Sequence, residues 1–375
     1  MRRVVFVIPT LDQSGAERQL VLLATGLVRA GYDIHVVALN RSGPLAKPLH
    51  DAGIPIHVLG KRFRFDVLTG FRLRRLLHHL KPDIVQSYLF SANACVRLPG
   101  TCPAGTRVLI SERCVDSWKS RWQRRLDRIM AKRMDAMIAN SQSVAEFYAA
   151  SGIPRERIHV IPNGIPFVEQ TAEEREQCRR ELRAELHLQE GQPLVGFAGR
   201  LAPQKRLEDL IWAFQLLHQV VDGVRLVLIG DGPDRDSLAM FARNMHCRDK
   251  IIFAGHRSDA RRLLSGLDVF ALPSAFEGMS NSLMEAMAAG IPVVASDIPA
   301  NCELVEHDVT GLTYRLGEAP ELTRALKRVL DNVELAGCLA ATAMNRIRLE
   351  HSVEGLVEQH QLLYAAMTDR AMGKA

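Results

Sequence analysis

Short β-branched and aliphatic runs alternate with stretches of helical periodicity along the whole chain. An apolar run of about four to eight residues bounded by turn signals is typical of a buried strand, and strands that alternate with helices form parallel sheets covered on both faces. The pattern therefore predicts two doubly wound α/β domains. A first series of strands is expected at residues 4–8, 34–39, 54–58, 84–86, 108–110, 136–139 and 159–161, and a second at 195–198, 226–229, 251–253, 269–272 and 293–295.

A charged, helical stretch without a strong strand pattern separates the two series. We interpret residues 1–166 as an N-terminal Rossmann-like domain, 167–193 as a linker and 194–350 as a second Rossmann-like domain. Residues 351–375 are expected to form a helix and tail that pack back toward the N-terminal domain. Because ligands bind beyond the carboxyl ends of the strands in open α/β sheets, two facing sheets predict a site in the cleft between the domains.

Composition narrows the class of protein. The chain has 375 residues, of which 47% are hydrophobic and 24% charged, a mixture that excludes disordered, collagen-like and coiled-coil proteins. Its apolar runs are too short for a membrane span, and residues 1–9 suit a buried first strand better than a signal peptide. The seven cysteines form neither C-x-x-C pairs nor clusters at zinc spacing, which predicts a cytoplasmic protein without a metal site.

Positive charge is concentrated in the first half of the chain. Residues 1–165 hold 25 Lys and Arg against 12 Asp and Glu, whereas the whole chain holds 48 against 42. Such an asymmetry predicts a polyanionic partner, either an anionic membrane surface or a nucleic acid. Since the sequence shows no nucleic-acid recognition module, we expect no nucleic-acid partner.

One of the basic stretches, residues 113–133, also has the periodicity of an amphipathic helix. Trp118, Trp122, Leu126, Ile129 and Met130 share one helical stripe, and basic residues occupy much of the remaining surface. A basic amphipathic helix with tryptophans is typical of proteins that lie on a membrane surface. The alternative is an ordinary surface helix whose apolar stripe packs on the sheet.

Candidate chemistry lies in the loops that follow strands. Gly15 stands in the loop after the first strand, where the start of a helix can hold an anionic group. In the second domain Arg200 and Lys205 flank a loop that contains proline, and they can converge on one diphosphate, the arginine as a fork and the lysine as a point charge. The alternatives are a plain tight turn at Gly15 and a solvated basic loop at the two cations.

The segment 273–297 carries the strongest signal. Glu277 follows a strand, and Glu285 comes eight residues later on the next helix. Two carboxylates that accept hydrogen bonds from hydroxyl groups, on either side of a phosphate site, suit a nucleotide sugar, with one for the ribose and one for the hexose. The backbone amides that begin the helix between them can hold that phosphate, namely those of Gly278, Met279 and Ser280.

With Glu277 and Glu285 at E-x(7)-E spacing, the segment 273–312 resembles the signature of glycosyltransferase family 4, the retaining transferases of the GT-B fold. The run Ser14-Gly15-Ala16-Glu17-Arg18 resembles the N-terminal glycine loop of that family, and Arg200 and Lys205 match its diphosphate pair. The resemblance covers nearly the whole chain. It implies that Glu285 binds the ribose hydroxyls and Glu277 the donor sugar, while Arg200 and Lys205 stabilise the leaving diphosphate.

Two positions depart from the family pattern. The histidine motif that follows the fourth strand in similar family members is replaced here by Gln86-Ser87-Tyr88, so Gln86 or Tyr88 is the candidate substitute on the acceptor side, together with Arg113. The family's N-G-[IV]-D has become Asn163-Gly-Ile-Pro166, a change that we expect to affect only the hinge.

The resemblance implies a retaining transferase that needs no metal or other cofactor. It would move a hexose from a UDP-sugar, or next from a GDP-sugar, to a lipid-linked or oligosaccharide acceptor in surface polysaccharide or lipopolysaccharide synthesis. We expect a cytoplasmic protein, with an anionic membrane surface as a further partner of the basic N-terminal domain at the inner membrane. The alternatives are a nucleotide-binding scaffold without turnover and a related GT-B epimerase or phosphorylase.

Overall fold

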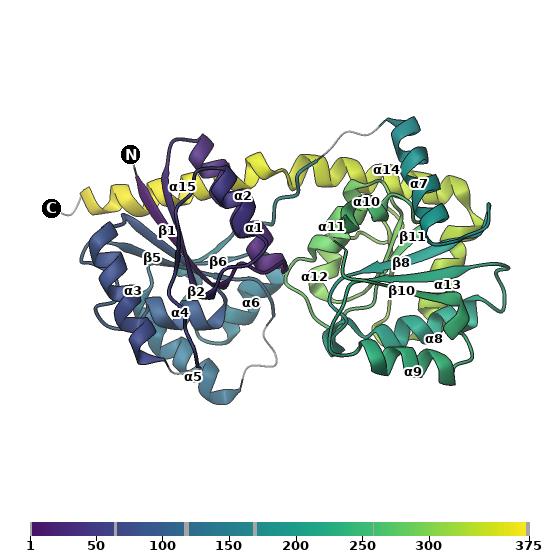
Figure 1. Ribbon diagram of the computed structural model, residues 1–375, viewed down its shortest axis with the longest axis horizontal. Helices are drawn as coiled ribbons and strands as arrows, with labels where there is room; N and C mark the ends of the chain where they lie inside the picture. The colour runs from purple at the N-terminus through teal and green to yellow at the C-terminus, as the bar shows by residue number, and fades with distance from the viewer. Residues whose placement is uncertain (1, 64–65, 116–119, 168–170, 258, 373–375) are drawn as a thin grey trace. The chain divides into compact units, whose positions relative to one another are not determined.

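The computed structural model describes residues 2–63, 66–115, 120–167, 171–257 and 259–372. The chain divides into two compact units, of which unit 1 holds Met1–Gly164 with Val353–Ala375 and unit 2 holds Ile165–Ser352. Each unit is a parallel sheet with helices on both faces (Figure 1), so the predicted pair of doubly wound α/β domains is confirmed.

Unit 1 is built on a seven-stranded parallel sheet in the order β3-β2-β1-β4-β5-β6-β7. Along β1, Val4, Phe6 and Ile8 enter one hydrophobic core while Val5 and Val7 enter another, because successive side chains of a strand point to opposite faces. The strands are β1 (Arg3–Thr10), β2 (Asp33–Arg41), β3 (Ile56–Val58), β4 (Ile84–Tyr88), β5 (Arg107–Glu112), β6 (Ala136–Ala139) and β7 (Ile158–Val160).

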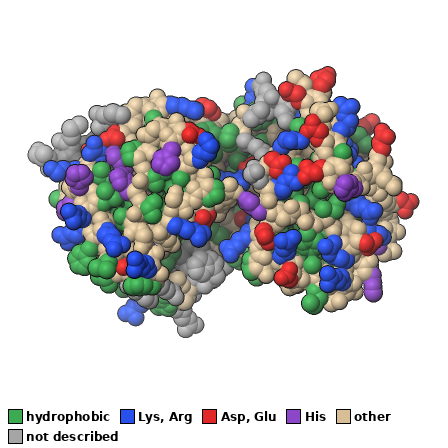
Figure 2. All heavy atoms as spheres, in the orientation of Figure 1, with side chains coloured by type: hydrophobic (Ala, Val, Ile, Leu, Met, Phe, Trp, Pro, Cys, Tyr) green, Lys and Arg blue, Asp and Glu red, His purple; other side chains and the backbone are tan. Residues whose placement is uncertain are grey.

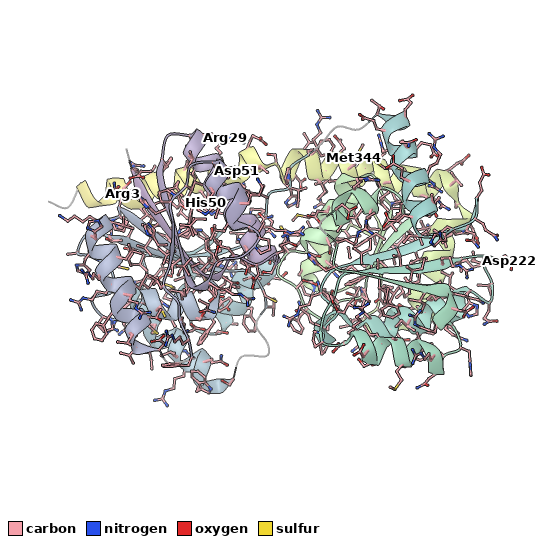
Figure 3. All side chains as sticks on the ribbon, viewed as in Figure 1. Arg3, Arg29, His50, Asp51, Asp222 and Met344 are labelled. Atoms are coloured by element: carbon pink, nitrogen blue, oxygen red, sulfur yellow. The ribbon has the colours of Figure 1, made fainter. Side chains whose placement is uncertain are left out.

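Two layers of helices cover this sheet. The first core lies against α1, α2 and α15, and the second against α3, α4 and α6. Side chains fill the space between sheet and helices (Figure 3). The helices are α1 (Gly15–Arg29), α2 (Ala46–Asp51), α3 (Val67–Leu80), α4 (Leu89–Val96), α5 (Arg121–Met130), α6 (Gln142–Ala150) and α15 (Val353–Met372).

Unit 2 contains a six-stranded parallel sheet in the order β10-β9-β8-β11-β12-β13. The last strand, which follows a turn and includes the polar Thr313, was not predicted. The strands are β8 (Leu194–Ala198), β9 (Arg225–Ile229), β10 (Ile251–Gly255), β11 (Val269–Leu272), β12 (Val293–Ser296) and β13 (Leu312–Tyr314). The helices are α7 (Ala172–Glu185), α8 (Leu207–Leu217), α9 (Arg235–Asn244), α10 (Ala260–Leu264), α11 (Asn281–Ala288), α12 (Pro299–Cys302), α13 (Ala319–Asp331) and α14 (Val333–Glu350).

Two segments outside the predicted domain bounds belong to the compact units. The stretch 167–193, which we interpreted as a linker, contains α7, and Leu182 of α7 is buried in the core of unit 2. Arg183 also forms a 2.7 Å ion pair with Asp268 beside β11. At the other end, α15 returns to unit 1, where Val357 packs tightly against Gly26 of α1.

Candidate functional site

Two strand-end loops of unit 2 bring Lys205 and Glu277 together. Lys205 Nζ lies 2.5 Å from Glu277 Oε1, and the two side chains are 14% and 9% exposed. Lys205 ends a short 3₁₀ turn after β8, whereas Glu277 follows β11. Parallel strands end at the same edge of their sheet, and β8 pairs directly with β11, so residues 72 positions apart in sequence become neighbours.

A hydrogen-bonded tie between the same two loops holds this pair in place. The Gln204 side-chain amide donates to the carbonyl of Phe276 at 2.6 Å, and the Gln204 carbonyl accepts from the amide of Ala275 at 2.9 Å. Gln204 was not predicted as a site residue. Its position beside Lys205 was visible in the sequence, but its partner loop was not.

Glycine lets the loop after β8 lie against the loop after β9. A Cβ atom on Gly230 would lie 1.9 Å from the carbonyl oxygen of Gly199, a distance that no side chain tolerates, and Gly230 has a φ of +137°. The amide of Leu201 then donates to the carbonyl of Asp231 at 3.0 Å. This packing leaves Arg200 exposed at the strand edge, on the same loop as Lys205.

Helix α11 begins at the end of the predicted phosphate-binding turn. Ser280 is its N-cap, and the Ser280 hydroxyl accepts from the amide of Leu283 at 3.4 Å. Glu285 is half-buried on this helix. The three residues expected to hold a phosphate precede the helix as a buried turn, namely Gly278, Met279 and Ser280.

The N-terminal loop of unit 1 contains a buried carboxylate. Gly15 is the exposed first residue of α1, directly after the N-cap Ser14. Glu17 is only 3% exposed, and its carboxylate accepts from the hydroxyls of Thr10, at 3.1 Å, and Ser14. Burial raises the pKa of Glu17, although its hydrogen bonds oppose the shift. The helix start that we predicted to hold an anion therefore also contains an acid of the protein.

The acceptor-side candidates Gln86 and Tyr88 lie inside unit 1. They are 0% and 1% exposed. The Gln86 amide donates to Tyr88 Oη at 2.8 Å and to Ser111 Oγ at 3.0 Å. The hydroxyl of Tyr364, on α15, donates back to Gln86 Oε1 at 2.5 Å. Gln86 and Tyr88, both on β4, are thus held by hydrogen bonds that reach β5 and α15.

Arg113 is half-buried, and its charge interacts with Tyr88 of this network. Its guanidinium donates to the side-chain oxygen of Asn163, and burial lowers the pKa of Arg113 to about 10. His360 of α15 also faces this region, since the charge of Arg113 lowers its pKa further after burial has done so, to about 4. The Nδ1–H of His360 donates to the carbonyl of Leu356 at 2.8 Å, and Nε2 has no partner among the described residues.

Tyr364 and His360 lie beside Gln86, Tyr88 and Arg113, and neither was predicted from the sequence as a site residue. They are four residues apart, on one face of a helix, and Tyr364 lies 278 residues along the chain from Gln86, to which it donates. We had assigned this helix a packing role alone. The sequence feature that could have identified them is the i, i+4 spacing of two polar aromatic side chains, His360 and Tyr364, on the apolar face of α15.

In the described part of the chain, no three His, Cys, Asp or Glu side chains lie close enough together to hold a metal ion. Metal independence stays a prediction. Likewise, no helix in the described ranges is long and apolar enough to cross a membrane.

Family models match both halves of the chain. Residues 13–167 match "Glycosyltransferase Family 4", and residues 179–345 match "Glycosyl transferases group 1". The two matches follow one another and contain the glycine loop, the two cations and both glutamates. The chain belongs to glycosyltransferase family 4. The resemblance based on the E-x(7)-E spacing is thereby confirmed.

Curated relatives of this family 4 member include several bacterial glycosyltransferases. It is 28% identical over 332 residues to a GDP-mannose-dependent alpha-mannosyltransferase of Mycobacterium tuberculosis, with 81% of each chain covered. It is 28% identical to the lipopolysaccharide core biosynthesis glycosyltransferase LpsE of Rhizobium meliloti, covering 62% of this chain and 64% of LpsE. It is 26% identical to the N-acetyl-alpha-D-glucosaminyl L-malate synthase of Bacillus anthracis, covering 49% and 48%. The chain thus spans less than two thirds of the length of several relatives that it matches.

Solved structures confirm the GT-B fold. The chain superimposes on Anabaena Alr3699/HepE in complex with UDP-glucose with a TM-score of 0.87, at 22% identity, over 98% of this chain and 100% of the other. The sucrose-phosphate synthase of Thermosynechococcus elongatus gives a TM-score of 0.81 at 17% identity, over 99% and 100%. The predicted placement of the site between the two domains stays a prediction.

Proposed function

We propose that this family 4 member is a retaining, metal-independent hexosyltransferase that uses a UDP-sugar, or in second place a GDP-sugar. The observation that carries the proposal is the Lys205–Glu277 pair at the strand edge of unit 2, beside the turn that begins α11. A cation, an acid and a row of backbone amides there are the groups that a nucleoside-diphosphate sugar requires.

Each residue receives a role from its charge and position. Lys205 and the exposed Arg200 would stabilise the negative charge that grows on the departing diphosphate, because preorganised charges act most strongly where charge develops. Glu277 would accept hydrogen bonds from donor-sugar hydroxyls, and Glu285 from the ribose. With these charges in place, the acceptor hydroxyl would attack the anomeric carbon on the face from which the diphosphate leaves, which retains configuration. The proton of that hydroxyl would pass to the departing phosphate oxygen as the C–O bond to the diphosphate breaks.

The two donor bases are both supported by related proteins. The relatives include a GDP-mannose-dependent enzyme, and the structural neighbours include complexes with UDP and UDP-glucose. A lipid-linked or oligosaccharide acceptor, in surface polysaccharide or lipopolysaccharide synthesis, is supported by the net positive charge of the first half of the chain and by the name of the LpsE relative. We place the reaction in the cytoplasm, at the inner face of the membrane.

The experiment is a thermal stability panel with UDP, GDP, ADP and their common sugars, on the wild type and on Glu285→Ala. Ligands that bind only the folded protein raise Tm with concentration, so one nucleoside diphosphate should stabilise the wild type. Glu285→Ala should lose that rise in Tm, whereas Glu190→Ala, at an exposed turn of the same unit, should keep it. The absence of any rise at millimolar nucleotide would contradict the proposal. A rise in Tm without transfer to any glycolipid or oligosaccharide acceptor would favour the scaffold.

A further inference from the structure

Helix α5 turns its polar side toward the protein and part of its apolar side toward solvent. Gln123 and Asp127 are buried at 8% and 5% exposure, whereas Trp122 and Ile129 are 48% and 62% exposed. One of our two expectations placed the apolar stripe of this helix on the sheet. Of that stripe, Met130 is buried and Leu126 is half-buried, whereas Trp122 and Ile129 are exposed. Trp118 lies outside the described residues.

A buried ion pair explains this orientation. Arg97, just after α4, is fully buried, and its Nη2 lies 2.6 Å from Asp127 Oδ1. The Nε–H of Arg97 donates to the carbonyl of Asn93 at 2.8 Å. Rotating α5 to bury Trp122 would expose or separate this pair, and a buried arginine left without its partner is strongly destabilising. The exposure of the tryptophan is therefore built into the fold.

Helix α3 presents a second apolar group. Leu73 and Leu77 are buried in the core, as expected for one face of an amphipathic helix. The opposite side of its first turns is also apolar, with exposures from 62% to 70% for Val67, Leu68 and Phe71. Phe63, in the segment before the helix, is 63% exposed.

Helix α4 and the loop after it lie between α3 and α5. Phe90 of α4 makes an edge-to-face contact with Trp122 of α5, with ring centroids 6.3 Å apart. The imidazole of His78 on α3 hydrogen-bonds the carbonyl of Gly100 at 3.2 Å, just past Leu98, which is 47% exposed. The exposed apolar side chains therefore belong to one face of unit 1, which we call the α3–α5 face. Its members are Phe63, Val67, Leu68, Phe71, Leu98, Trp122 and Ile129.

Basic side chains accompany these apolar ones. Arg72, Arg74, Arg75 and Arg125 are all exposed, and green and blue side chains gather over α3 in the space-filling view (Figure 2). Among the described residues of the region, Asp127 is neutralised by Arg97, and Asp66, which accepts from the hydroxyl of Thr69 at 2.9 Å, is outnumbered by the four arginines. The net charge of the α3–α5 face is therefore positive.

We propose that the α3–α5 face binds the surface of an anionic bilayer. Aromatic and aliphatic side chains interleaved with arginines match the two layers of such a surface, since the apolar groups enter the acyl boundary while the arginines remain among the anionic headgroups. A nucleic acid would fit this face poorly, because its phosphates interact with the arginines but leave the large aliphatic side chains exposed to water. The inference concerns a surface of unit 1 and does not depend on the transfer reaction proposed above.

The test is co-sedimentation of the full chain with vesicles of phosphatidylglycerol and phosphatidylcholine, against vesicles of phosphatidylcholine alone. The wild type should bind the anionic vesicles, and salt should weaken that binding. The double variant Trp122→Ser/Ile129→Ser should bind at least about tenfold more weakly, because apolar insertion and charge both contribute to membrane affinity. Both positions are already exposed, so the variant should keep its Tm.

A matched control comes from unit 2, where Trp212 and Met240 are 44% and 61% exposed. Trp212→Ser/Met240→Ser should bind vesicles like the wild type. The rise in Tm with nucleotide, which reports on unit 2, should be the same in both double variants. Failure of the wild type to bind anionic vesicles, or an equal loss of binding in the control variant, would overturn the proposal. So would concentration-dependent self-association that only Trp122→Ser/Ile129→Ser abolishes, since a second copy of the chain would then be the occupant of this face.

Discussion

The strand ends of the two units contrast sharply although both sheets are doubly wound. In unit 2 they carry a charged pair, Lys205 and Glu277, in which each side chain keeps some exposure. In unit 1 the end of β4 is closed by neutral hydrogen bonds among Gln86, Tyr88 and Tyr364, all buried. The ionisable groups Glu17 and Arg113 follow the neighbouring strands β1 and β5. Charges near solvent can be exchanged for those of a ligand, whereas a buried neutral network holds its own atoms in place. The first edge is suited to binding, and the second to positioning.

The largest expected effect comes from removing the charge at the unit 2 edge. Lys205→Ala should lower kcat/KM for transfer by about 100- to 1000-fold, because one preorganised group that faces developing charge contributes about that much. Steady-state kinetics with the nucleotide sugar identified by the thermal panel measures the effect. Lys327→Ala, which removes an exposed lysine paired with Asp331 on α13, should leave kcat/KM unchanged.

The double variant Lys205→Ala/Glu277→Gln separates catalysis from structure. If the pair only stabilised the fold, removing both charges would restore Tm and activity together, since neither partner would be left as an unpaired buried charge. We expect Tm to recover in the double variant while kcat/KM stays low. Recovery of kcat/KM would remove Lys205 and Glu277 from the proposed mechanism and would weaken the contrast between the two edges.

The same contrast explains which parts of the molecule the sequence could predict. All twelve predicted strands are present, because buried parallel strands give local apolar runs. Lys205 and Glu277 each lie in a loop that directly follows such a strand, whereas the donor-binding roles of these residues stay predictions. The tie from Gln204 to Phe276 and the hydrogen bond from Tyr364 to Gln86 join segments 72 and 278 residues apart. Periodicity within one segment contains no information about such partners. For α5, likewise, periodicity predicted a helix but not its orientation, which the buried Arg97–Asp127 pair determines.

A smaller effect is expected from the acid titration of unit 1. The pKa of His360 is lowered from 6.5 to about 4 in the folded protein, chiefly by burial. Below pH 6.5 the unfolded chain therefore binds a proton that the folded one does not, so stability falls as the pH drops toward 4. The full loss from this one group is about 3 kcal/mol, since one pKa unit corresponds to about 1.4 kcal/mol.

Urea unfolding at several pH values between 7 and 4 would measure this loss. His360→Asn keeps a side-chain donor near the Leu356 carbonyl but cannot be protonated, so its free energy of unfolding should fall less steeply with acid than that of the wild type. The matched control is His50→Asn, at an exposed histidine of α2 that Figure 3 labels, and it should follow the wild type. Parallel curves for wild type and His360→Asn would show that burial of the imidazole does not suppress its protonation.

The smallest effect tests whether the neutral network of unit 1 positions rather than binds. Tyr364→Phe removes the hydroxyl that donates to Gln86 Oε1 and leaves that buried oxygen without its donor, which should cost about 1 to 2 kcal/mol in the free energy of unfolding. Unit 2 offers the opposite case in Tyr314, whose buried hydroxyl has no hydrogen-bond partner among the described residues, so Tyr314→Phe should be neutral or slightly stabilising. Nucleotide-induced rises in Tm should survive in Tyr364→Phe, while the KM for acceptor rises, since Arg113 lies next to Tyr88 in the same network. Equal stability losses in the two variants would mean that the hydrogen bond to Gln86 contributes nothing beyond the packing of a ring, and the two strand edges would then differ only in charge.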